Sequence, residues 1–273
     1  MNTLRTDIRI ACIGCGTMGS AIMQAVMQMV APSCITVSGG ESGRARDFAK
    51  KTGCSFAASN AEAAAAADVV FIAVKPAAVP AVLKEIRHEL RGKTLVSMAA
   101  GVPLCAVREL CAHESVRCVR IMPNTPVSVG EGMIALSGDE TTPPEVCTEI
   151  AALLAPAGKV EIIPELLIDC AGAVSGCGPA YCFLFIESLA DAAVLLGMPR
   201  RQAYTYAAQT LKGAAELVLR TGTHPAALKD SVCSPGGTTI EAVKKLEEGG
   251  FRAAVLNAVQ AAYDKTLLLA KKR

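Results

Sequence analysis

The sequence has no tryptophan and few aromatic side chains of any kind, which make up 4 % of its 273 residues. It also lacks an excess of either charge, because 27 Lys and Arg residues stand against 25 Asp and Glu residues. A near-neutral chain lacks the basic footprint of a nucleic-acid-binding protein, so we expect no nucleic-acid partner. No apolar run approaches the roughly 20 residues of a membrane span, and the N-terminal residues do not resemble a signal peptide. We therefore expect no membrane partner and a cytoplasmic location.

Apolar residues are abundant, at 52 % of the chain, and this content excludes a disordered protein. The 12 cysteines are scattered, mostly within apolar segments. Cys12 and Cys15 have C-x-x-C spacing but lie inside a glycine motif, with no second pair at ligand spacing and only three histidines in the chain. We therefore predict no metal site and interpret the cysteines as free, small apolar side chains in a reducing cytoplasm.

Short β-branched runs alternate with helical stretches over the first 165 residues. The early runs are apolar throughout, like strands buried on both faces, and the alternation predicts a parallel sheet with right-handed crossovers. The expected strands are 9–13, 34–37, 69–74, 94–98, 116–122, 132–137 and 160–163. The expected helices are 20–30, 44–51, 61–67, 77–90, 104–112 and 145–155. Ser59 and Glu62 have the spacing of a capping box for the third helix.

After about residue 165 the strand pattern stops and a helical pattern continues to the end of the chain. These helices carry apolar side chains on more faces than four helices can bury among themselves. We infer a dimer interface in this half, with packing against the first half as the alternative. The expected helices are 179–196, 200–220, 238–248 and 251–272.

A G-x-G-x-x-G motif formed by Gly14, Gly16 and Gly19 follows the first expected strand and precedes a helix. The glycines permit a tight turn and the close approach of a pyrophosphate, which the amides and dipole of a helix N-terminus attract. An ordinary glycine-rich turn is the alternative. We predict a Rossmann-like α/β dinucleotide-binding domain over residues 1–165, followed by an all-α dimerisation domain over residues 166–273.

The end of the second strand bears on the choice of dinucleotide. An NAD site would place an acidic residue there, whereas this chain continues with Ser38 and two glycines, followed by Arg44 and Arg46. Small polar groups beside guanidinium groups favour a 2′-phosphate and hence NADPH, although the nearby Glu41 leaves NADH possible. Later strand ends carry small residues and prolines, which suit a flat nicotinamide. These segments are 75–76, 99–101 and 122–126.

A second informative segment, VCSPGGTTIE, covers residues 232–241. Thr238 and Glu241 have capping-box spacing, so a helix should begin here after a Pro-Gly-Gly bend. The amides of residues 236–239 would then bind a small carboxylate, with a plain capped turn as the alternative. Residues 175–181 form a similar glycine-rich segment at the start of a helix. This segment either lines the same substrate site or lets the helix approach the sheet closely.

The helical half has no lysine between Gly176 and Asp191, and His224 is its only histidine. A hydroxyacid dehydrogenase usually needs such a group to remove a hydroxyl proton. A protonated imine is already electrophilic, so a protein that reduces it needs only to hold the carboxylate, offer a hydroxyl to the nitrogen and align the hydride. The residues therefore favour imine reduction.

Seven motifs, spread in order over nearly the whole chain, resemble those of the pyrroline-5-carboxylate reductase family. The most specific is SPGGTTIEAV, and several motifs in order are far stronger evidence than a glycine fingerprint alone. The motifs are GCGTMG (14–19), FIAVKP (71–76), MAAGV (98–102), RIMPNTP (120–126), SGCGPAY (175–181), GMPRRQA (197–203) and SPGGTTIEAV (234–243).

The resemblance implies NAD(P)H-dependent reduction of 1-pyrroline-5-carboxylate to L-proline, the last step of proline biosynthesis, by hydride transfer to the C=N carbon. It also implies a homodimer formed through the helical domain, assembled into a larger ring such as a decamer. Ser234 and Thr239 would be catalytic, with the Thr239 hydroxyl near the imine nitrogen. The substrate-binding residues would be Ser234, Gly237, Thr238 and Thr239. The cofactor-binding residues would be Ile13, Gly14, Cys15, Gly16, Thr17, Met18, Gly19, Ser38, Asn60, Ala73, Val74, Lys75, Pro76, Met98, Ala99 and Ala100.

Three alternatives remain from the residues themselves. The protein could reduce another cyclic imino acid, because ring size cannot be inferred from a motif. It could be a relative among the β-hydroxyacid dehydrogenases, although the missing helix lysine argues against this. A non-catalytic NADP(H)-binding regulator would not need the intact segment Ser234–Thr239.

Overall fold

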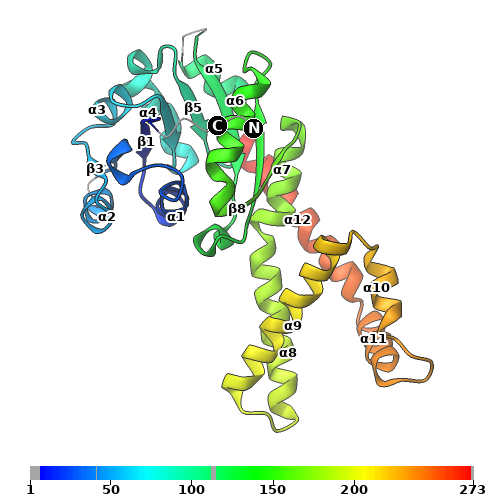
Figure 1. The fold of residues 1–273 in the computed structure, drawn as a ribbon. Coiled ribbons are helices and arrows are strands. Elements are labelled where there is room, and N and C mark those ends of the chain that lie inside the picture. Colours follow the sequence, from blue (N-terminus) through cyan, green and yellow to red (C-terminus); the bar gives the residue numbers. More distant parts are fainter. Residues whose placement is uncertain (1–6, 41, 112–114, 272–273) are drawn as a thin grey trace. The chain divides into compact units, whose positions relative to one another are not determined.

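The computed structural model describes residues 7–40, 42–111 and 115–271 (Figure 1). The chain divides into two compact units, one made of residues up to Cys177 together with those from Ala262 onward, the other of Gly178–Ala261. Each unit has a buried apolar core of its own. Glu41 and the expected ends of two helices, Ala112 and Lys272, lie outside the described residues.

The first unit is built on one eight-stranded sheet with the strand order β3-β2-β1-β4-β5-β6-β7-β8. Strands are added to one side of β1 and then to the other, which creates a switch point between β1 and β4. All seven expected strands are present with ends shifted by a residue or two, and the eighth, β3, is too short to leave a sequence pattern. The strands are β1 (Ile10–Ile13), β2 (Ile35–Ser38), β3 (Ser55–Phe56), β4 (Val69–Ile72), β5 (Thr94–Ser97), β6 (Arg117–Met122), β7 (Gly132–Gly138) and β8 (Gly158–Ile162).

The pair formed by β6 and β7 is antiparallel, which corrects the expectation of a wholly parallel sheet. The link between these strands, residues 123–131, contains only the 3-10 turn η4 (Thr125–Val129). A parallel pair needs a crossover of a dozen or more residues, so a link this short returns the chain beside its predecessor. The other strand pairs of the described sheet are parallel.

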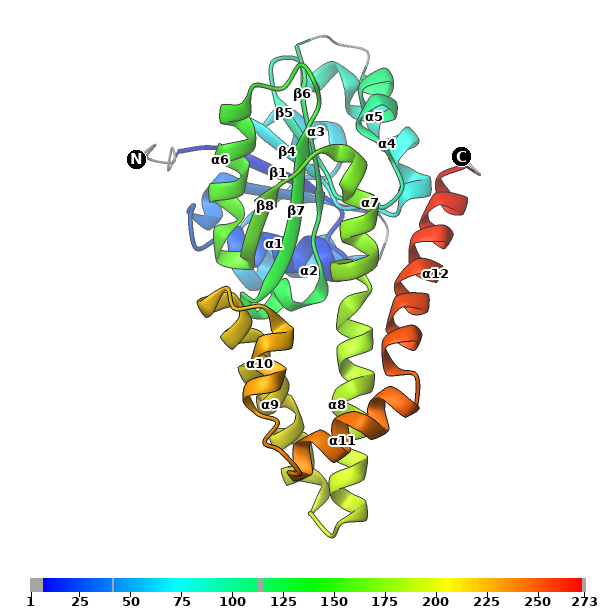
Figure 2. The same cartoon turned by 90° about the vertical axis from the view of Figure 1, so that its right-hand side faces the viewer.

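Helices cover both faces of the sheet and form two apolar clusters (Figure 2). Neighbouring residues of a strand point to opposite faces, so Phe71 of β4 lies in the cluster under α1, α2 and α6. Val70 lies in the cluster under α3, α4 and α5. This double burial explains the continuous apolar runs of the early strands. The helices are α1 (Thr17–Val26), α2 (Arg44–Thr52), α3 (Asn60–Ala65), α4 (Val79–Ile86), α5 (Leu104–Cys111) and α6 (Pro144–Leu154).

Two of these helices differ from their expected bounds. The helix expected over 20–30 begins at Thr17, because the last residues of the glycine motif already form its first turn. The helix expected over 77–90 is α4 flanked by two 3-10 turns, η2 (Pro76–Ala78) and η3 (Arg87–Leu90). Proline at the start of η2 supports a turn of this kind, since it supplies a fixed φ and needs no hydrogen-bond acceptor.

A continuous helical stretch covers residues 165–195 and includes η6 (Glu165–Leu167), α7 (Ile168–Ala171), the π-helical turn η7 (Gly172–Gly176) and α8 (Gly178–Leu195). By length and composition alone it could cross a membrane, because its most apolar window of 18 residues has a mean hydropathy of 1.4. The sequence pattern did not indicate a helical stretch of this length. Several glycines and Pro179 interrupt the helical pattern in the sequence, so only the part after residue 178 is predictable as helix.

The second unit is entirely helical, which confirms the predicted order of an α/β domain followed by an all-α segment. Its buried core consists of three alanines, Ala190, Ala203 and Ala207. Large apolar side chains are exposed instead, including Phe183 at 63 % and Leu256 at 70 %. The helices are α8, α9 (Arg200–Thr221), α10 (Pro225–Ser231), α11 (Thr238–Glu248) and the first part of α12 (Phe251–Lys271), of which only the seven-residue α10 has no sequence prediction.

Candidate dinucleotide and carboxylate sites

The predicted cofactor residues lie along one edge of the sheet. The strand register pairs Ile13 at the end of β1 with Ser38 of β2 and with Ile72 of β4, and it pairs Ile72 with Ser97 of β5. The residues that follow these four therefore leave the sheet side by side, at the carboxyl ends of parallel strands and beside the switch point. Ligands of doubly wound sheets bind at this place.

The three glycines of the motif have different roles in the loop after β1. Gly14 has a φ of +103°, and a Cβ there would lie 2.6 Å from the carbonyl oxygen of Ala73. A Cβ on Gly19 would collide with the carbonyl oxygen of Gly14. A Cβ on Gly16 would meet no protein atom within 4 Å. Gly14 and Gly19 are thus required by the fold of the loop, whereas Gly16 leaves open space for a ligand.

The helix α1 begins directly behind this open space. Its cap residue is Gly16, which has no side chain to cap the helix, and no side chain among the described residues hydrogen-bonds to the first-turn amides. The first-turn amides and the positive end of the helix dipole are therefore available to an anion. The loop itself is fixed by a hydrogen bond of 2.9 Å from the Gly14 amide to the Ser38 carbonyl. The predicted pyrophosphate residues, Ile13 to Met18, form the end of β1, this loop and the first turn of α1, and their geometry fits a pyrophosphate.

All 12 cysteines are free thiols, and Cys12 and Cys15 are buried beside the glycine loop. A hydrogen bond with Cys15 and burial together raise the pKa of the Cys12 thiol well above its usual value. Cys12 is therefore neutral at physiological pH, and its thiol donates to the carbonyl oxygen of Gly14 over 3.6 Å. This is the behaviour of a small apolar side chain in a packed core.

Ser38 and Asn60 come from distant parts of the sequence and are brought together at the end of β2. The buried Ser38 hydroxyl donates to the Oδ1 atom of Asn60 at 2.9 Å. Asn60 is the first residue of α3, and a bond of 3.1 Å from the Glu62 amide to the Ser59 hydroxyl confirms the first half of the predicted capping box, whereas the Glu62 carboxylate accepts from the Ala58 amide. Glu85 of α4 accepts from the side-chain amide of Asn60 at 2.7 Å. No sequence signal indicated Glu85, because its partner lies 25 positions away.

The two arginines near the end of β2 have different surroundings. The guanidinium of Arg46 lies over the ring of Phe56, 5.1 Å from its centroid. Arg44 is the first residue of α2, and its Nε atom donates to the Ser42 hydroxyl at 3.3 Å. Contact with the face of a ring does not occupy the N–H donors of Arg46, so both guanidinium groups after β2 keep donors that could bind a 2′-phosphate.

The predicted nicotinamide-side residues follow β4 and β5. The amide of Ala73 donates to the Ile13 carbonyl at 2.8 Å, and the amide of Met98 donates to the Ile72 carbonyl at 3.2 Å. The chain leaves β4 through Val74–Pro76, which leads into η2, and leaves β5 through the small residues Ala99 and Ala100. The Lys75 side chain is exposed, as a solvated loop charge would be.

Asn124, at the end of β6, connects the same edge to the helical stretch. Its side chain is buried, donates to the Ser175 carbonyl at 3.0 Å and accepts from the Met133 amide at 2.9 Å. These two bonds fix the loop after β6 against η7 and β7. The sequence motif around Asn124 indicates a strand end, but spacing alone does not reveal its two partners.

The predicted substrate residues lie in the second unit, before and at the start of α11. The amide of Gly237 donates to the Ser234 carbonyl at 3.0 Å and closes the Pro-Gly-Gly bend. The helix begins at Thr238 as expected, but its cap is Gly237 and has no side-chain hydrogen bond, so the capping box between Thr238 and Glu241 is wrong. Thr238 cannot cap a helix of which it is already the first residue. The first-turn amides and the exposed Ser234 and Thr239 are therefore available to a carboxylate.

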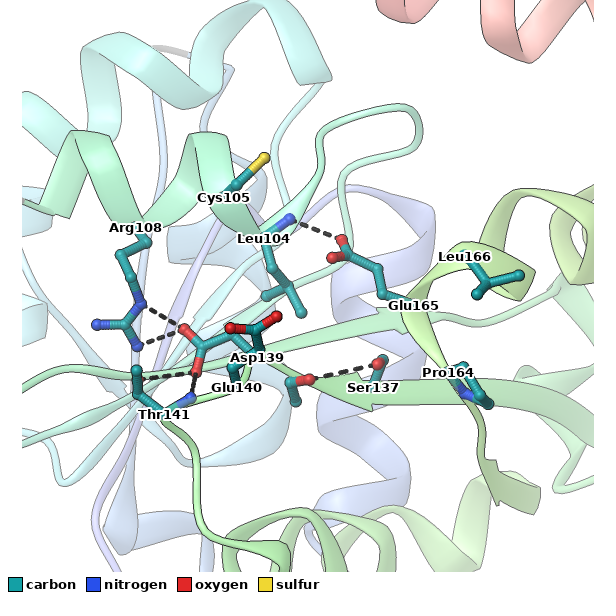
Figure 3. A pocket seen from close by; sticks show the side chains of 11 residues that line it. Leu104, Cys105, Arg108, Ser137, Asp139, Glu140, Thr141, Pro164, Glu165 and Leu166 are labelled. Atoms are coloured by element: carbon teal, nitrogen blue, oxygen red, sulfur yellow. Dashed lines mark hydrogen bonds and ion pairs between the residues drawn. The ribbon is translucent and has the colours of Figure 1, made fainter.

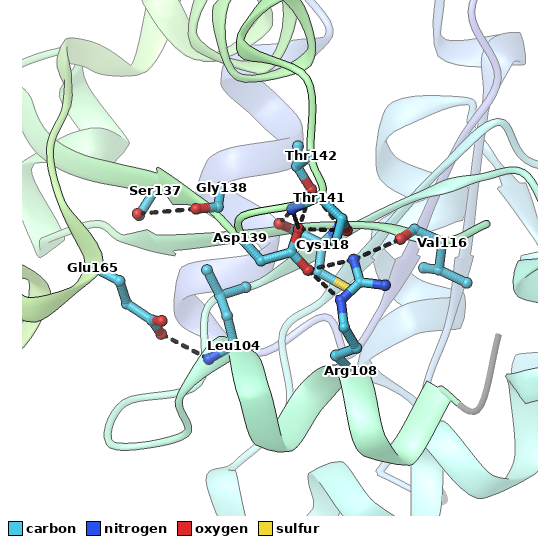
Figure 4. A network of polar contacts seen from close by, with 10 residues as sticks. All are labelled: Leu104, Arg108, Val116, Cys118, Ser137, Gly138, Asp139, Thr141, Thr142 and Glu165. Atoms are coloured by element: carbon cyan, nitrogen blue, oxygen red, sulfur yellow. Dashed lines mark hydrogen bonds and ion pairs between the residues drawn. The ribbon is translucent and has the colours of Figure 1, made fainter. Parts of the chain in front are cut away.

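A cavity of about 560 Å³ lies between α5, the end of β7 and the turn after β8 (Figure 3). Two of its charged groups bind each other, because Asp139 accepts from Arg108 at 2.5 Å, and Asp139 also accepts from the Thr142 hydroxyl at 2.8 Å (Figure 4). Burial alone would raise the pKa of Asp139, but the hydrogen bonds from Thr142 and Arg108 outweigh it and lower this pKa. Glu165 accepts from the Leu104 amide at 2.6 Å. None of the predicted site residues lines this cavity, and its network attaches α5 to the sheet.

The doubly wound sheet, the glycine loop before an open helix N-terminus and the small residues at the next strand ends define a dinucleotide-dependent oxidoreductase. Residues 9–101 match the family model described as NADP oxidoreductase, coenzyme F420-dependent. Residues 165–269 match the model described as pyrroline-5-carboxylate reductase dimerisation.

Similar proteins cover the chain from end to end. It is 44 % identical over 266 residues to the pyrroline-5-carboxylate reductase of Escherichia coli (strain K12), which covers 96 % of this chain and 98 % of that one. It is 40 % identical over 267 residues to that of Methanosarcina acetivorans, covering 97 % and 98 %. The crystal structure of Plasmodium falciparum pyrroline carboxylate reductase with NADP bound has a TM-score of 0.88 and 32 % identity, covering 97 % and 99 %. The chain belongs to the pyrroline-5-carboxylate reductase family.

Proposed function

We propose that this protein reduces 1-pyrroline-5-carboxylate to L-proline with NAD(P)H, the last step of proline biosynthesis. The observation that carries this function is the end-to-end match at 44 % identity to a reductase of that name. The bound dinucleotide supplies the hydride. The residues of the chain must hold both molecules, orient the C=N carbon toward the nicotinamide and donate a hydrogen bond to the nitrogen.

Ser234 and Thr239 are the proposed catalytic residues. The first-turn amides of α11 and the Ser234 hydroxyl bind the substrate carboxylate, because no side chain occupies these amides. The Thr239 hydroxyl donates to the ring nitrogen and aligns the imine for reduction. Gly237 and Thr238 complete the substrate site, and a Cβ on Gly237 would collide with the Ser234 hydroxyl. Glycine at this position therefore keeps the serine in place.

The cofactor-binding residues follow the edge of the sheet. Residues 13–18 hold the pyrophosphate, with Gly19 permitting the loop that they form, and the open space at Gly16 supports this assignment. Ser38 and Asn60 hold the adenosine ribose, while Ala73–Pro76 and Met98–Ala100 border the nicotinamide half. Arg44 and the absence of an acidic residue at position 38 favour NADPH, with NADH as a second cofactor.

The proposed assembly is a homodimer through the helical domain, with a larger ring such as a decamer built from dimers. The small core of the second unit and the exposure of Phe183 and Leu256 support it, because an all-α unit with three buried alanines needs further apolar contacts. The same partner surface accounts for the apolar character of residues 165–195. We place the protein in the cytoplasm, without a nucleic-acid or membrane partner.

A kinetic comparison of Thr239 variants tests the mechanism. With NADPH and 1-pyrroline-5-carboxylate, the wild-type protein should deplete the nicotinamide absorbance. Thr239→Ala should lower kcat by about tenfold to a hundredfold and leave dinucleotide binding unchanged, because one hydrogen bond to the reacting nitrogen is lost.

Thr239→Ser should recover most of the rate, and Thr205→Ala makes the same change as Thr239→Ala at an exposed position of α9 without loss of activity. An unchanged kcat in Thr239→Ala would remove this hydroxyl from the mechanism. Turnover of a six-membered cyclic imino acid, but not of 1-pyrroline-5-carboxylate, would contradict the proposed substrate.

A further inference from the structure

Two segments of the chain join the first unit to the second, and both are attached to the first unit at strand ends. The chain leaves the first unit after Cys177 and returns to it at Ala262. The departing segment ends with η7, and the returning segment is the last part of α12. β5 and β6 are parallel neighbours with Ser97 in register with Arg120, so the loops that follow these two strands leave the same edge of the sheet. Each loop holds one of the two segments.

The first attachment holds η7 against the loop after β6. Pro179, four residues after Ser175, has no amide hydrogen, so the usual helical donor to the Ser175 carbonyl is missing. The side chain of Asn124 supplies a donor instead, with its Nδ2 atom 3.0 Å from that carbonyl oxygen. The Oδ1 atom of Asn124 accepts from the Met133 amide at 2.9 Å. Since only the amide nitrogen can donate and only the amide oxygen can accept, these two bonds fix the orientation of the side chain and the place of η7.

The second attachment holds the end of α12 against the loop after β5. Gly101 in this loop is buried and has a φ of +67°. A Cβ on Gly101 would lie 3.7 Å from the Cβ atom of Ala270 and equally far from the carbonyl oxygen of Thr266. Loop and helix therefore approach each other through two small residues. A branched side chain at position 270 would push the loop and the helix apart.

We propose that Asn124 and Ala270 are positioning residues for hydride transfer, because they fix the two segments that lead to the helical unit at neighbouring strand ends. The proposal rests on the proposed function, which places the dinucleotide on the first unit and the imine at Ser234 and Thr239 of the second. Hydride transfer requires close alignment of the two reacting carbons, and a displacement of about 1 Å can lower the rate about a hundredfold. Asn124 acts through η7, and Ala270 acts through α12.

Each attachment also stabilises the fold, and the test must separate stability from position. Lower stability alone reduces the fraction of folded protein but leaves the rate of each folded molecule unchanged. A loosened attachment leaves dinucleotide binding intact, since the glycine loop and β2 both belong to the first unit. It slows the step in which both units take part. The deciding measurement is therefore the single-turnover rate of nicotinamide oxidation per bound NADPH, with protein in excess of NADPH and with saturating imine.

The first variant is Asn124→Asp. The carboxylate still accepts from the Met133 amide, but it has no proton to donate to the Ser175 carbonyl. We expect the single-turnover rate per bound NADPH to fall about tenfold to a hundredfold, while the Kd of NADPH from fluorescence titration without substrate stays unchanged. Gln28→Glu makes the corresponding change from amide to carboxylate at an exposed residue between α1 and β2, and it should alter neither quantity.

The second variant, Ala270→Leu, loosens the other segment and should slow the same step by a similar factor without changing the Kd of NADPH. Ala31→Leu, at an exposed residue before β2, is its matched control. An unchanged rate per bound NADPH in either variant, or a loss confined to dinucleotide affinity, would overturn the proposal. A wild-type protein that does not reduce the imine would instead contradict the proposed function. An active wild type with equally active variants contradicts the positioning role alone, so the two failures are distinguishable.

Discussion

Replacing Gly16 by alanine should separate cofactor binding from stability. Gly16 has a φ of −74° and a ψ of −174°, which alanine adopts freely, and its Cβ would meet no protein atom within 4 Å. Alanine lowers the conformational entropy of the unfolded chain, which stabilises the folded variant by about 0.4–1 kcal/mol. Alanine is also a poorer helix cap than glycine, which destabilises the variant by about as much. We expect the free energy of unfolding to change by less than about 1 kcal/mol, which corresponds to a Tm shift of about 2–4 °C at most.

The added methyl group would instead occupy the space through which a pyrophosphate reaches the amides of α1. We expect tenfold or greater weakening of both NADPH and NADH binding, a loss of at least about 1.4 kcal/mol. Gly14→Ala is the matched contrast, because a φ of +103° and the Ala73 carbonyl at 2.6 Å should lower its Tm markedly. Calorimetry and fluorescence titration measure the two properties. Undiminished dinucleotide affinity of folded Gly16→Ala would refute the pyrophosphate assignment.

Three further changes address the hydrogen bonds of the fold and the dimer interface. Asp139→Asn should cost about 1.5–3 kcal/mol in urea unfolding at pH 7, because charge-assisted hydrogen bonds are lost. Because the pKa of Asp139 is lowered in the folded protein, its ionised form stabilises the fold above the ordinary aspartate pKa of about 3.9. The free energies of unfolding of variant and wild type should therefore converge as the pH falls below that value, and a difference that stays constant with pH would contradict this. Asn124→Leu should lower Tm by orphaning the Ser175 carbonyl and the Met133 amide, whereas an unchanged Tm would show that these bonds contribute nothing. Phe183→Lys should weaken the dimer about 30-fold or more in sedimentation analysis, and an unaffected dimer would remove this residue from the interface.

The fold could be predicted wherever local pattern determines it. Continuous apolar runs such as Val69–Ile72 identify buried strands, because both faces of the sheet are covered. The antiparallel β7 could not be predicted from its own residues, because its direction depends on the length of the preceding link. The helical turns over residues 165–177 were also missed, since glycines that favour turns in isolation are held in a helix here by tertiary contacts such as that of Asn124.

In the candidate site, too, features set by local pattern are predictable and features set by tertiary contacts are not. The glycine loop is predictable because the backbone conformation of Gly14 requires a residue without a side chain, whereas glycine at position 16 is needed only for the proposed pyrophosphate. The capping box at α3 is predictable from spacing, but the same spacing at α11 is misleading, because the helix there is capped one residue earlier by Gly237. The hydrogen bond between Glu85 and Asn60 could not be predicted, because it joins two helices and its two residues lie 25 positions apart.

Isotope transfer tests the proposed reaction most directly. The wild-type protein would be incubated with 1-pyrroline-5-carboxylate and NADPH or NADH in which both hydrogens at the reactive nicotinamide carbon are deuterium. We predict L-proline with one deuterium on the ring CH₂ group next to the nitrogen, in amounts equal to the dinucleotide oxidised. Oxidation of neither dinucleotide, or proline without deuterium at that carbon, would contradict hydride transfer to the C=N bond.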